Sequence, residues 1–196
     1  MSAAMPSRWL RRVSRGFTLI EVLVVLVLLS VMMVIAAPSF LSFQRNSELT
    51  TTSNEFLAAL TAARAEAMKR QLRAFVVPAD GSSWASGWIV FVDVNSNVTS
   101  GALTMEPTVD IEIARHQALP SSLAIETPVG STGFDDSGSK YAMFNGSGFM
   151  TLLGGTVGAH SLDITNGSEK RRIIANSTGR VRVCKPGASD CVTAGL

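Results

Sequence analysis

One carboxylate, Glu21, lies inside a nearly unbroken apolar run that extends from Phe17 to Ala37 and is followed by Pro38. The run is long enough to cross a bilayer as a helix, because a span needs about 20 apolar residues. An ionisable side chain within hydrocarbon is destabilising even on lenient insertion scales, so an acid in this position indicates a function and requires a partner. Glu21 therefore constrains this chain more than any other residue does.

The segment before the apolar run, residues 1–16, is basic and contains no acid. Its charged residues are Arg8, Arg11, Arg12 and Arg15. Such a segment stays on the cytoplasmic side of the membrane. A secretory signal would be cut behind its apolar core, near Ala37, and the core discarded, but Glu21 within that core argues against this reading. The alternative cut lies before the core, between Gly16 and Phe17, and creates a free amine.

The residues Gly16-Phe-Thr-Leu-Ile-Glu21 resemble the type III signal of type IV pilins and type II secretion pseudopilins. The resemblance implies that a prepilin peptidase cleaves after Gly16 and N-methylates Phe17. It also implies that Glu21 helps to dock the subunit into a helical filament, and that Pro38 kinks the helix. The Phe17 ammonium and a neighbouring subunit's Glu21 carboxylate are complementary charges, and in a low dielectric a pair is less costly than an isolated charge. A plain membrane anchor is the alternative.

After Pro38 the sequence keeps a helical period but becomes amphipathic. The apolar stripe recurs every three or four residues and comprises Leu49, Ser53, Phe56, Leu60, Ala63 and Ala67, widened by Leu57 and Met68. We therefore predict one helix from about Phe17 to about Arg73, roughly 85 Å long. The expected divisions are a cleaved cytoplasmic leader (1–16), a transmembrane helix half (17–38), an amphipathic helix half (39–73) and a periplasmic head (74–196).

The rest of the chain alternates short β-prone runs with Gly, Ser, Asn and Pro clusters. The predicted strands are Leu72–Val77, Gly87–Asp93, Val109–His116, Leu123–Thr127, Lys140–Asn145, Gly148–Leu153, His160–Thr165, Lys170–Ala175 and Gly179–Cys184. Asn145-Gly146 and Asn166-Gly167 are predicted hairpin turns, because both residues of such a pair tolerate positive φ. The expected fold class is α+β, with one long N-terminal helix packed on an antiparallel β-sheet head, as in the pilin ladle.

Two segments of the head, Trp84 to Asn97 and Ile173 to Arg182, narrow the resemblance. With the signal helix they resemble the FimT and FimU minor pilins and the H-type pseudopilin GspH. This resemblance implies a non-enzymatic minor pilin of the bacterial inner membrane that crosses it once and has a periplasmic head. Its implied partners are prepilin peptidase and other pilins, with which it primes assembly at or near the tip of a type IV pilus. The alternative is an H-type pseudopilin of a type II secretion system.

Signals of catalysis, cofactor binding and metal binding are weak. His116 and His160 lack HxxH or HExxH spacing, and the sequence has no nucleophile elbow and no phosphate-binding Gly-rich motif. The segment Asp93 to Asn97 offers alternating oxygen ligands like the start of an EF-hand loop, but Val98 stands where that loop needs glycine, so a turn is favoured over a calcium site. We predict no catalytic residues, no cofactor and no metal.

Charge is distributed unevenly along the chain. Four of the 17 basic residues belong to the leader, so the remaining chain has 13 basic against 15 acidic residues. Residues 74–168 contain two basic and nine acidic residues, whereas residues 169–196 contain six basic and two acidic residues. A basic C-terminal block is therefore attached to an acidic body.

The two cysteines, Cys184 and Cys191, flank a short turn-rich segment in this basic block. An oxidising periplasm favours a disulfide between them, whereas a metal site would lack further ligands. In the strand that ends at Cys184, a period of two puts Arg180 and Arg182 on one face and the intervening valines on the other.

The segment Gly179 to Arg182, Gly-Arg-x-Arg, resembles the C-terminal motif of FimT-type minor pilins that bind DNA for uptake in natural transformation. Guanidinium groups bind phosphates in a bidentate way, and such binding weakens as salt rises. The candidate contacts to double-stranded DNA are Arg180, Arg182, Lys170, Arg171, Arg172 and Lys185. No aromatic residue accompanies the arginines in the sequence, so phosphate contact is supported and base readout is not. Alternatively, the arginines pair with the acidic body or with a neighbouring subunit.

Overall fold

The computed structural model describes residues 16–99, 101–128, 131, 134–136, 138–189 and 191, with the backbone alone at residues 35–38. The predicted leader lies outside these residues, except for Gly16. The chain divides into two compact units, one ending at Ser42 and the other, the head, beginning at Phe43. The second half of the long helix thus belongs to the same unit as the strands.

Helix α1 (Leu19–Arg70) begins within the predicted signal. The backbone N–H of Glu21 donates to Thr18 Oγ1 over 3.3 Å, and the N–H of Val22 donates to the Thr18 carbonyl over 3.2 Å. A threonine followed three residues later by glutamate is the sequence of a capping box, which satisfies free amides at the start of a helix. The large apolar side chains from Phe17 to Val34 are 47% to 81% exposed, so this part of the helix needs apolar surroundings from outside the chain.

Taken singly, no described helical segment is long and apolar enough to span a membrane. The segments Leu19–Val34 and Ser39–Arg70 pass this test, by length and composition alone, when they are joined across residues 35–38. Pro38, where a kink is expected, falls in this interval, and its side chain lies outside the described part of the chain. The transmembrane half of the helix therefore stays a prediction.

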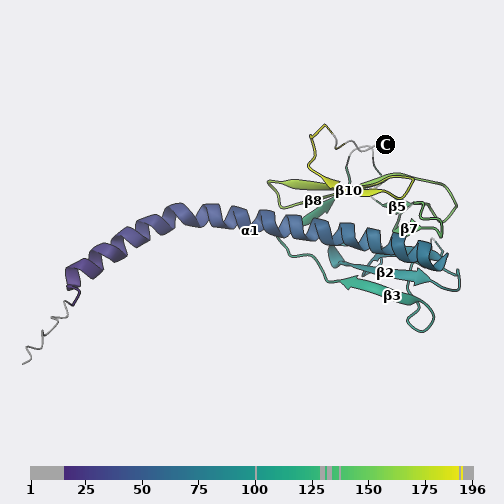
Figure 1. The fold of residues 1–196 in the computed structure, drawn as a ribbon, viewed down its shortest axis with the longest axis horizontal. Coiled ribbons are helices and arrows are strands. Elements are labelled where there is room, and N and C mark those ends of the chain that lie inside the picture. Colours follow the sequence, from purple (N-terminus) through teal and green to yellow (C-terminus); the bar gives the residue numbers. More distant parts are fainter. Residues whose placement is uncertain are drawn as a thin grey trace, which may run out of the picture. The chain divides into compact units, whose positions relative to one another are not determined.

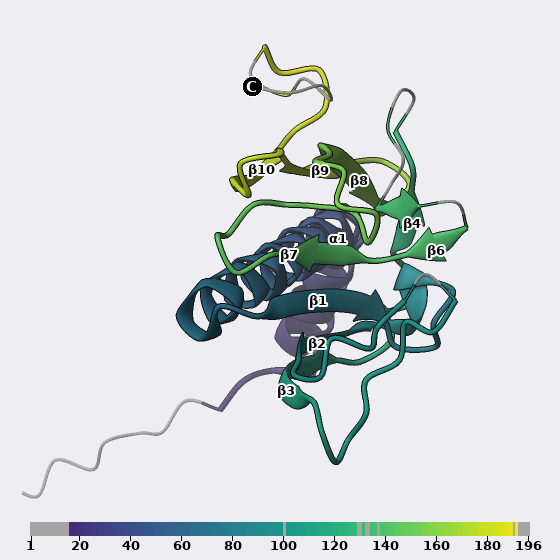
Figure 2. The ribbon, with the colours of Figure 1, turned by 90° about the vertical axis from the view of Figure 1, so that its right-hand side faces the viewer.

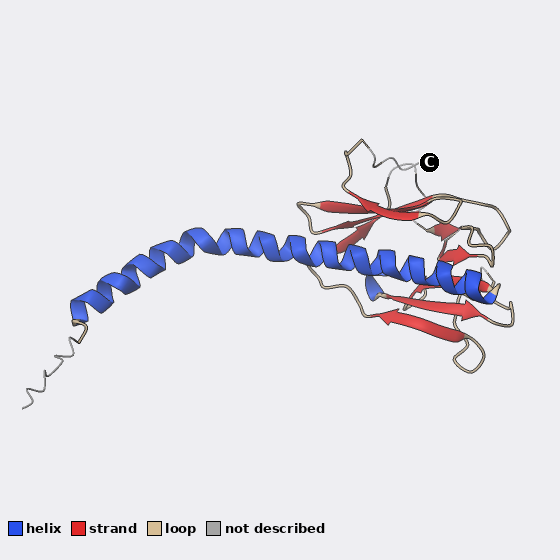
Figure 3. Ribbon diagram, viewed as in Figure 1, coloured by secondary structure: helices blue, strands red, loops and turns tan. Residues whose placement is uncertain are grey.

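In the head, the second half of α1 shares one core with two four-stranded antiparallel sheets, seen above and below the helix in Figures 1 and 3. The first sheet has the order β3-β2-β1-β7 and contains β1 (Arg73–Pro78), β2 (Trp88–Asp93), β3 (Ile111–His116) and β7 (Ala142–Phe144). The second has the order β10-β9-β8-β4 and contains β4 (Ala124–Glu126), β8 (His160–Thr165), β9 (Lys170–Ala175) and β10 (Val181–Cys184). This arrangement confirms the α+β fold.

Smaller elements connect the sheets. A 3₁₀ helix, η1 (Trp84–Ser86), precedes β2, and a two-stranded sheet is formed by β5 (Asp135–Asp136) and β6 (Ser139–Lys140). Figure 2 shows β6 and β7 between β1 and the second sheet. Along the chain, β5 and β6 thus lie between β4 of the second sheet and β7, the edge strand of the first.

The helix ends at Arg70 because Gln71 adopts a left-handed conformation, with a φ of 57°. The N–H of Leu72 bonds to the Ala67 carbonyl over 3.3 Å, and Gln71 Nε2 donates to the Met68 carbonyl over 2.7 Å. A left-handed residue followed by such a bond is typical of helix C-termini, where it satisfies free carbonyls. The predicted helix end at Arg73 is therefore late, since that residue already belongs to β1.

The predicted apolar stripe of α1 is confirmed, because all six of its members are fully buried. Phe56 lies at its centre and meets Trp84, Trp88 and Phe134 edge to face, with ring centroids 4.9 to 6.0 Å apart. The stripe is widened by the buried residues Thr52 and Ala59. Of the two residues predicted to widen it, Leu57 is only half-buried and Met68 is 39% exposed, so the prediction for Met68 is wrong.

Seven of the predicted strands are present with ends shifted by two residues or fewer. The predicted strand at Lys140–Asn145 is divided between β6 and β7. The predicted strand at Gly148–Leu153 is wrong, because Met150 and Thr151 form only isolated bridges. Gly148 has a φ of 80°, and the chain turns again where the Gly155 N–H bonds to the Leu152 carbonyl, so no extended run can form.

Both predicted Asn-Gly turns exist, but not with positive φ at both residues. After Asn166 only Gly167 is left-handed, and in the other loop the left-handed residue is Gly148 rather than Gly146. Each asparagine instead uses its side chain: Asn145 Oδ1 accepts the N–H of Phe149 over 3.0 Å, and Asn166 Oδ1 accepts the N–H of Glu169 over 2.8 Å. The asparagine side chains thus replace backbone partners within longer loops.

Candidate nucleic-acid interface

The Gly-Arg-x-Arg segment lies at the turn between β9 and β10. Asn176 organises this turn, because its Oδ1 accepts the Arg180 N–H and the Thr178 hydroxyl, each over 2.8 Å. The N–H of Asn176 donates to the Arg180 carbonyl over 3.0 Å, which continues the ladder between the two strands. Arg180 and Arg182 therefore point to the same face of the sheet.

The opposite face of β10 is apolar and faces the core. Val181 and Val183 pack against the main core cluster, as predicted. Arg180 is exposed and Arg182 is half-buried. Burial of the valines fixes the direction of both arginines, since side chains alternate along a strand.

Gly179, the first residue of the motif, is required by the tertiary structure. It has a φ of 78°, and a Cβ at this position would lie 2.0 Å from the Gly148 carbonyl oxygen. Arg64 of α1 holds the two loops together: its Nε donates to the Gly148 carbonyl over 3.0 Å and its Nη2 to the Thr178 carbonyl over 3.2 Å. This role of Arg64 was not predictable from the sequence, because its partners are distant along the chain.

Arg172 is bound within the head by Asp163, which faces it across β8 and β9. Its Nε and Nη2 each lie 2.7 Å from one carboxylate oxygen of Asp163, and the two side chains are 16% and 6% exposed. This bidentate hydrogen bond raises the pKa of Arg172 above its ordinary value. A guanidinium whose Nε–Nη2 edge is occupied by a buried carboxylate is a poor candidate for a phosphate contact.

The other three cations of the predicted site also have acidic partners. Lys170 Nζ lies 2.5 Å from Glu126 Oε2, and the hydrogen bond between them raises the pKa of Lys170. Glu169 Oε2 lies 2.7 Å from Lys185 Nζ and 3.8 Å from Arg171 Nη1. The hydrogen bond from Lys185 lowers the pKa of Glu169, which therefore stays ionised at neutral pH.

Arg180 and Arg182 differ from these four residues. No acid within the described part of the chain forms an ion pair with either of them. The structure thus brings all six predicted cations to β9, β10 and their adjoining loops. Four of them have an acidic partner, and the guanidinium groups of Arg180 and Arg182 have none among the residues that the structure describes. Charge available for an external anion is concentrated at Gly-Arg-x-Arg.

The predicted disulfide between Cys184 and Cys191 is confirmed, with the two Cα atoms 5.6 Å apart. Cys184 is the last residue of β10 and faces Arg172 in the register with β9. The disulfide therefore ties Cys191 to the last residue of β10, the strand that contains Arg182 and directly follows Arg180.

The segment Asp93 to Asn97 is a hydrogen-bonded turn, as predicted. Asp93 is fully buried and its carboxylate lies 2.6 Å from Arg73 Nη2. The side-chain amides of Asn95 and Asn97 both donate to Glu106, over 3.1 and 2.7 Å. Among the described residues, no group of three or more His, Cys, Asp or Glu side chains is placed to hold a metal ion.

Both histidines have packing roles. The ring of His116 stacks on Trp88 with centroids 3.9 Å apart, and its Nε2 lies 2.9 Å from a carboxylate oxygen of Glu55. His160 is buried against Phe134, with ring centroids 5.6 Å apart, and this burial lowers the pKa of His160.

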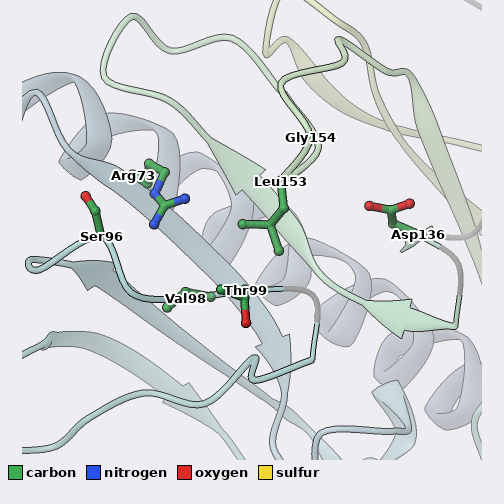
Figure 4. Close-up of a pocket in the computed structure, with 7 residues that line it drawn as sticks. All are labelled: Arg73, Ser96, Val98, Thr99, Asp136, Leu153 and Gly154. Carbon is green, nitrogen blue, oxygen red and sulfur yellow. The ribbon is translucent and has the colours of Figure 1, made fainter.

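A pocket of about 420 Å³ lies away from β9 and β10, and Figure 4 shows it. Its lining residues are Arg73, Ser96, Val98, Thr99, Asp136, Leu153 and Gly154. Arg73 is bound to Asp93, and Asp136 accepts the Tyr141 hydroxyl over 2.6 Å. In Figure 4 Leu153 separates Arg73 from Asp136, so the two charged groups do not converge on one point.

Comparison with known protein families agrees with the fold. The family described as Type II transport protein GspH matches residues 52–179, and the prokaryotic N-terminal methylation motif matches residues 11–37. Since the first match covers more than half of the chain, the protein belongs to the GspH family of type IV minor pilins and pseudopilins, which are structural rather than enzymatic. Arg180 and Arg182 follow directly after the matched region.

A solved minor pilin structure supports the same fold. The type IV minor pilin FimU of Pseudomonas aeruginosa is 17% identical, with a TM-score of 0.52 over 72% of this chain and 92% of that chain. The minor pseudopilin EpsH from the type II secretion system of Vibrio cholerae is 16% identical, with a TM-score of 0.49 over 74% of this chain and 98% of that chain. A search of the curated proteins gave no match. The likeness to FimU confirms the pilin fold and extends no further.

Proposed function

We propose that this chain is a minor type IV pilin that is cleaved after Gly16 by prepilin peptidase and methylated at Phe17. It is held in the bacterial inner membrane with its head in the periplasm, and it enters a pilus at or near the tip, where it primes assembly. The N-terminal methylation motif and the exposed apolar side chains from Phe17 to Val34 support this proposal. In the filament, the Phe17 amine of one subunit pairs with Glu21 of its neighbour.

The head, on this proposal, also binds double-stranded DNA through Arg180 and Arg182. The supporting observation is that these two guanidinium groups have no acidic partner in the described part of the chain, whereas the other four cations around them do. An unpaired guanidinium binds phosphate without first breaking an internal ion pair. Lys170, Arg171, Arg172 and Lys185 add to the local positive field but are secondary contacts.

A mobility-shift assay of the soluble head, residues 45–196, with duplex DNA at low and moderate salt tests this role. The wild-type head is expected to bind at low salt and to weaken as salt rises. Arg180→Ala/Arg182→Ala should abolish the shift. Lys170→Ala/Lys185→Ala removes the same formal charge from paired positions and should retain most of the binding. Absence of wild-type binding at low salt, or equal binding by the first double variant, would remove DNA from the proposed function.

An H-type pseudopilin of a type II secretion system is the second candidate. It is favoured by the description of the matching family, a type II transport protein. In that role the two arginines would contact the heads of other pseudopilins. Neighbouring genes for other minor pilins and a large adhesin-like tip protein would favour the pilus, whereas an adjoining secretion operon would favour the pseudopilin.

A further inference from the structure

An aromatic residue, Phe149, lies beside the Gly-Arg-x-Arg motif although it is distant from it in sequence. The loop that carries Phe149 runs along the β9–β10 turn, where the Met150 N–H donates to the Ser177 carbonyl over 3.1 Å. Gly148, the residue before Phe149, is also in contact with this turn. Its carbonyl oxygen is so close to Gly179 that a Cβ on Gly179 would lie 2.0 Å from it. Phe149 directly follows Gly148, and Arg180 directly follows Gly179, so this contact brings the backbones of Phe149 and Arg180 near each other.

The side chains of Phe149 and Arg180 face away from helix α1. A Cβ on Gly148 would meet Met68 of α1 at 2.6 Å, and Met150 is 1% exposed in the core, so the residue between them is the one that turns outward. Phe149 is accordingly 45% exposed. In the β9–β10 turn, Gly179 faces Arg64 of α1, and the next residue, Arg180, is exposed.

The backbone at Phe149 is held in place. Its N–H donates to Asn145 Oδ1 and its carbonyl accepts the Asn145 N–H, both over 3.0 Å. Arg64 binds the carbonyls of Gly148 and Thr178, which fixes this loop to the turn that precedes Arg180. The backbone that carries the ring is therefore held beside the turn that precedes Arg180 before any ligand binds, which reduces the entropy lost on binding.

An exposed ring on a loop that touches the β9–β10 turn, with two arginines that have no acidic partner among the described residues, matches the chemistry of a single-stranded nucleic acid. Unpaired bases stack on aromatic side chains, and the flanking phosphates bind to cations. In a duplex the base faces are covered by their neighbours, so a surface ring gains nothing from them. Such a site distinguishes single strands from duplexes without reading sequence.

We propose that Phe149, Arg180 and Arg182 form a binding site for single-stranded DNA, in which the ring stacks on a base and the two guanidinium groups hold the adjacent phosphates. This inference rests on the proposed binding of duplex DNA by the two arginines, and adds that the ring gives the head a preference for single strands. Phe149 supplies the aromatic contact that the motif lacks within its own sequence.

Fluorescence anisotropy with the processed chain, residues 17–196, in non-ionic detergent tests the site. The probes are a short labelled thymidine oligonucleotide, an abasic strand of the same length and a duplex of that length. Phe149→Ala should weaken binding of the thymidine strand about tenfold, which corresponds to the loss of one stacked base, and leave the abasic strand and the duplex unchanged. Phe149→Trp should retain binding, and Phe149→Leu, which keeps apolar bulk without a ring, should not.

Val157→Ala is the matched control, because Val157 is 51% exposed in a neighbouring loop and should leave every affinity unchanged. If Phe149→Ala leaves the thymidine strand unaffected, or weakens all three probes equally, the stacking site is overturned while the arginine site stands. If Arg180→Ala/Arg182→Ala leaves all three affinities unchanged, the proposed DNA binding fails first. Reduced filament incorporation of Phe149→Ala with unchanged DNA affinity would assign the ring to a subunit contact and overturn the site.

Discussion

Gly179 joins the local geometry of the β9–β10 turn to the packing of the head. Its φ of 78° is left-handed, and its missing side chain leaves room for the Gly148 carbonyl. That carbonyl cannot retreat easily, because it accepts a hydrogen bond from Arg64. The glycine of Gly-Arg-x-Arg is therefore needed to place the arginines, whether or not it meets a ligand.

Gly179→Ala is expected to destabilise the head by about 3 kcal/mol, from backbone strain and a steric clash together. Gly155→Ala is the matched control, since Gly155 has a φ of 79° but open space around it, and it should lose only about 1 kcal/mol. Urea unfolding of the two variants measures both values. Equal losses would show that the contact with Gly148 has no energetic consequence.

His160 predicts a pH dependence of stability. Burial lowers its pKa below the ordinary value of 6.5, although the charge of Asp136 opposes this shift. As the pH falls below about 6.5, the unfolded chain therefore binds a proton that the folded chain resists, and the folded state loses stability. Above this pH both states are neutral at His160 and the contribution vanishes.

The melting temperature of the head should accordingly be lower at about pH 5.5 than at about pH 7.5. His160→Gln, which cannot gain the charge, should reduce this difference when thermal unfolding is followed by circular dichroism. A variant that keeps the full pH dependence would assign the effect to other groups.

At the scale of elements, the second half of α1 organises the head. Its period of three and four residues predicts the buried stripe correctly, because the pattern depends only on helix geometry. The side toward which the stripe widens was not predictable, since it depends on where the two sheets lie. Thr52 and Ala59 are buried there, while Met68 remains exposed.

Phe56→Ala should destabilise the head by about 4 kcal/mol, because it removes a fully buried ring that meets three other aromatic rings. Leu57→Ala, at the next position of the same helix, should lose about 1 kcal/mol because Leu57 is only half-buried. Denaturant unfolding of both variants gives the comparison. Similar losses would mean that the aromatic cluster does not dominate the core.

The strands show the same division between local and tertiary information. Seven were predictable from alternation and flanking turn residues, which are local properties. The predicted strand at Gly148–Leu153 fails because the close approach of Gly148 to Gly179 and Arg64 bends the chain. That approach involves residues that are far apart in sequence.

At the scale of the whole molecule, the two ends of the chain have separate tasks in the proposed function. The exposed apolar helix with Glu21 serves assembly, and β9 and β10 serve binding. The family assignment covers the assembly role, since pilins and pseudopilins share it. The proposed binding role depends mainly on Arg180 and Arg182, which follow the matched region.

Glu21→Ala is expected to leave membrane insertion and cleavage intact but to reduce the amount of the protein in sheared filaments strongly, because the amine of the neighbouring subunit loses its counter-charge. Ser30→Ala is the control, since the Ser30 hydroxyl donates within its own helix, to the Val27 carbonyl over 2.7 Å. Immunoblots of membrane and filament fractions measure both variants. Normal incorporation of Glu21→Ala would contradict the pairing with Phe17.

The sequence by itself determined the family, the long helix with its buried stripe, most strands, the disulfide and the identity of the six basic residues. These features follow from local periodicity, composition and short motifs. Only the tertiary structure decided which of the six cations have an acidic partner among the described residues, because pairing depends on acids placed opposite them by strand register and loop closure. It also brought Phe149 to Gly-Arg-x-Arg, through contacts between loops that no local pattern encodes.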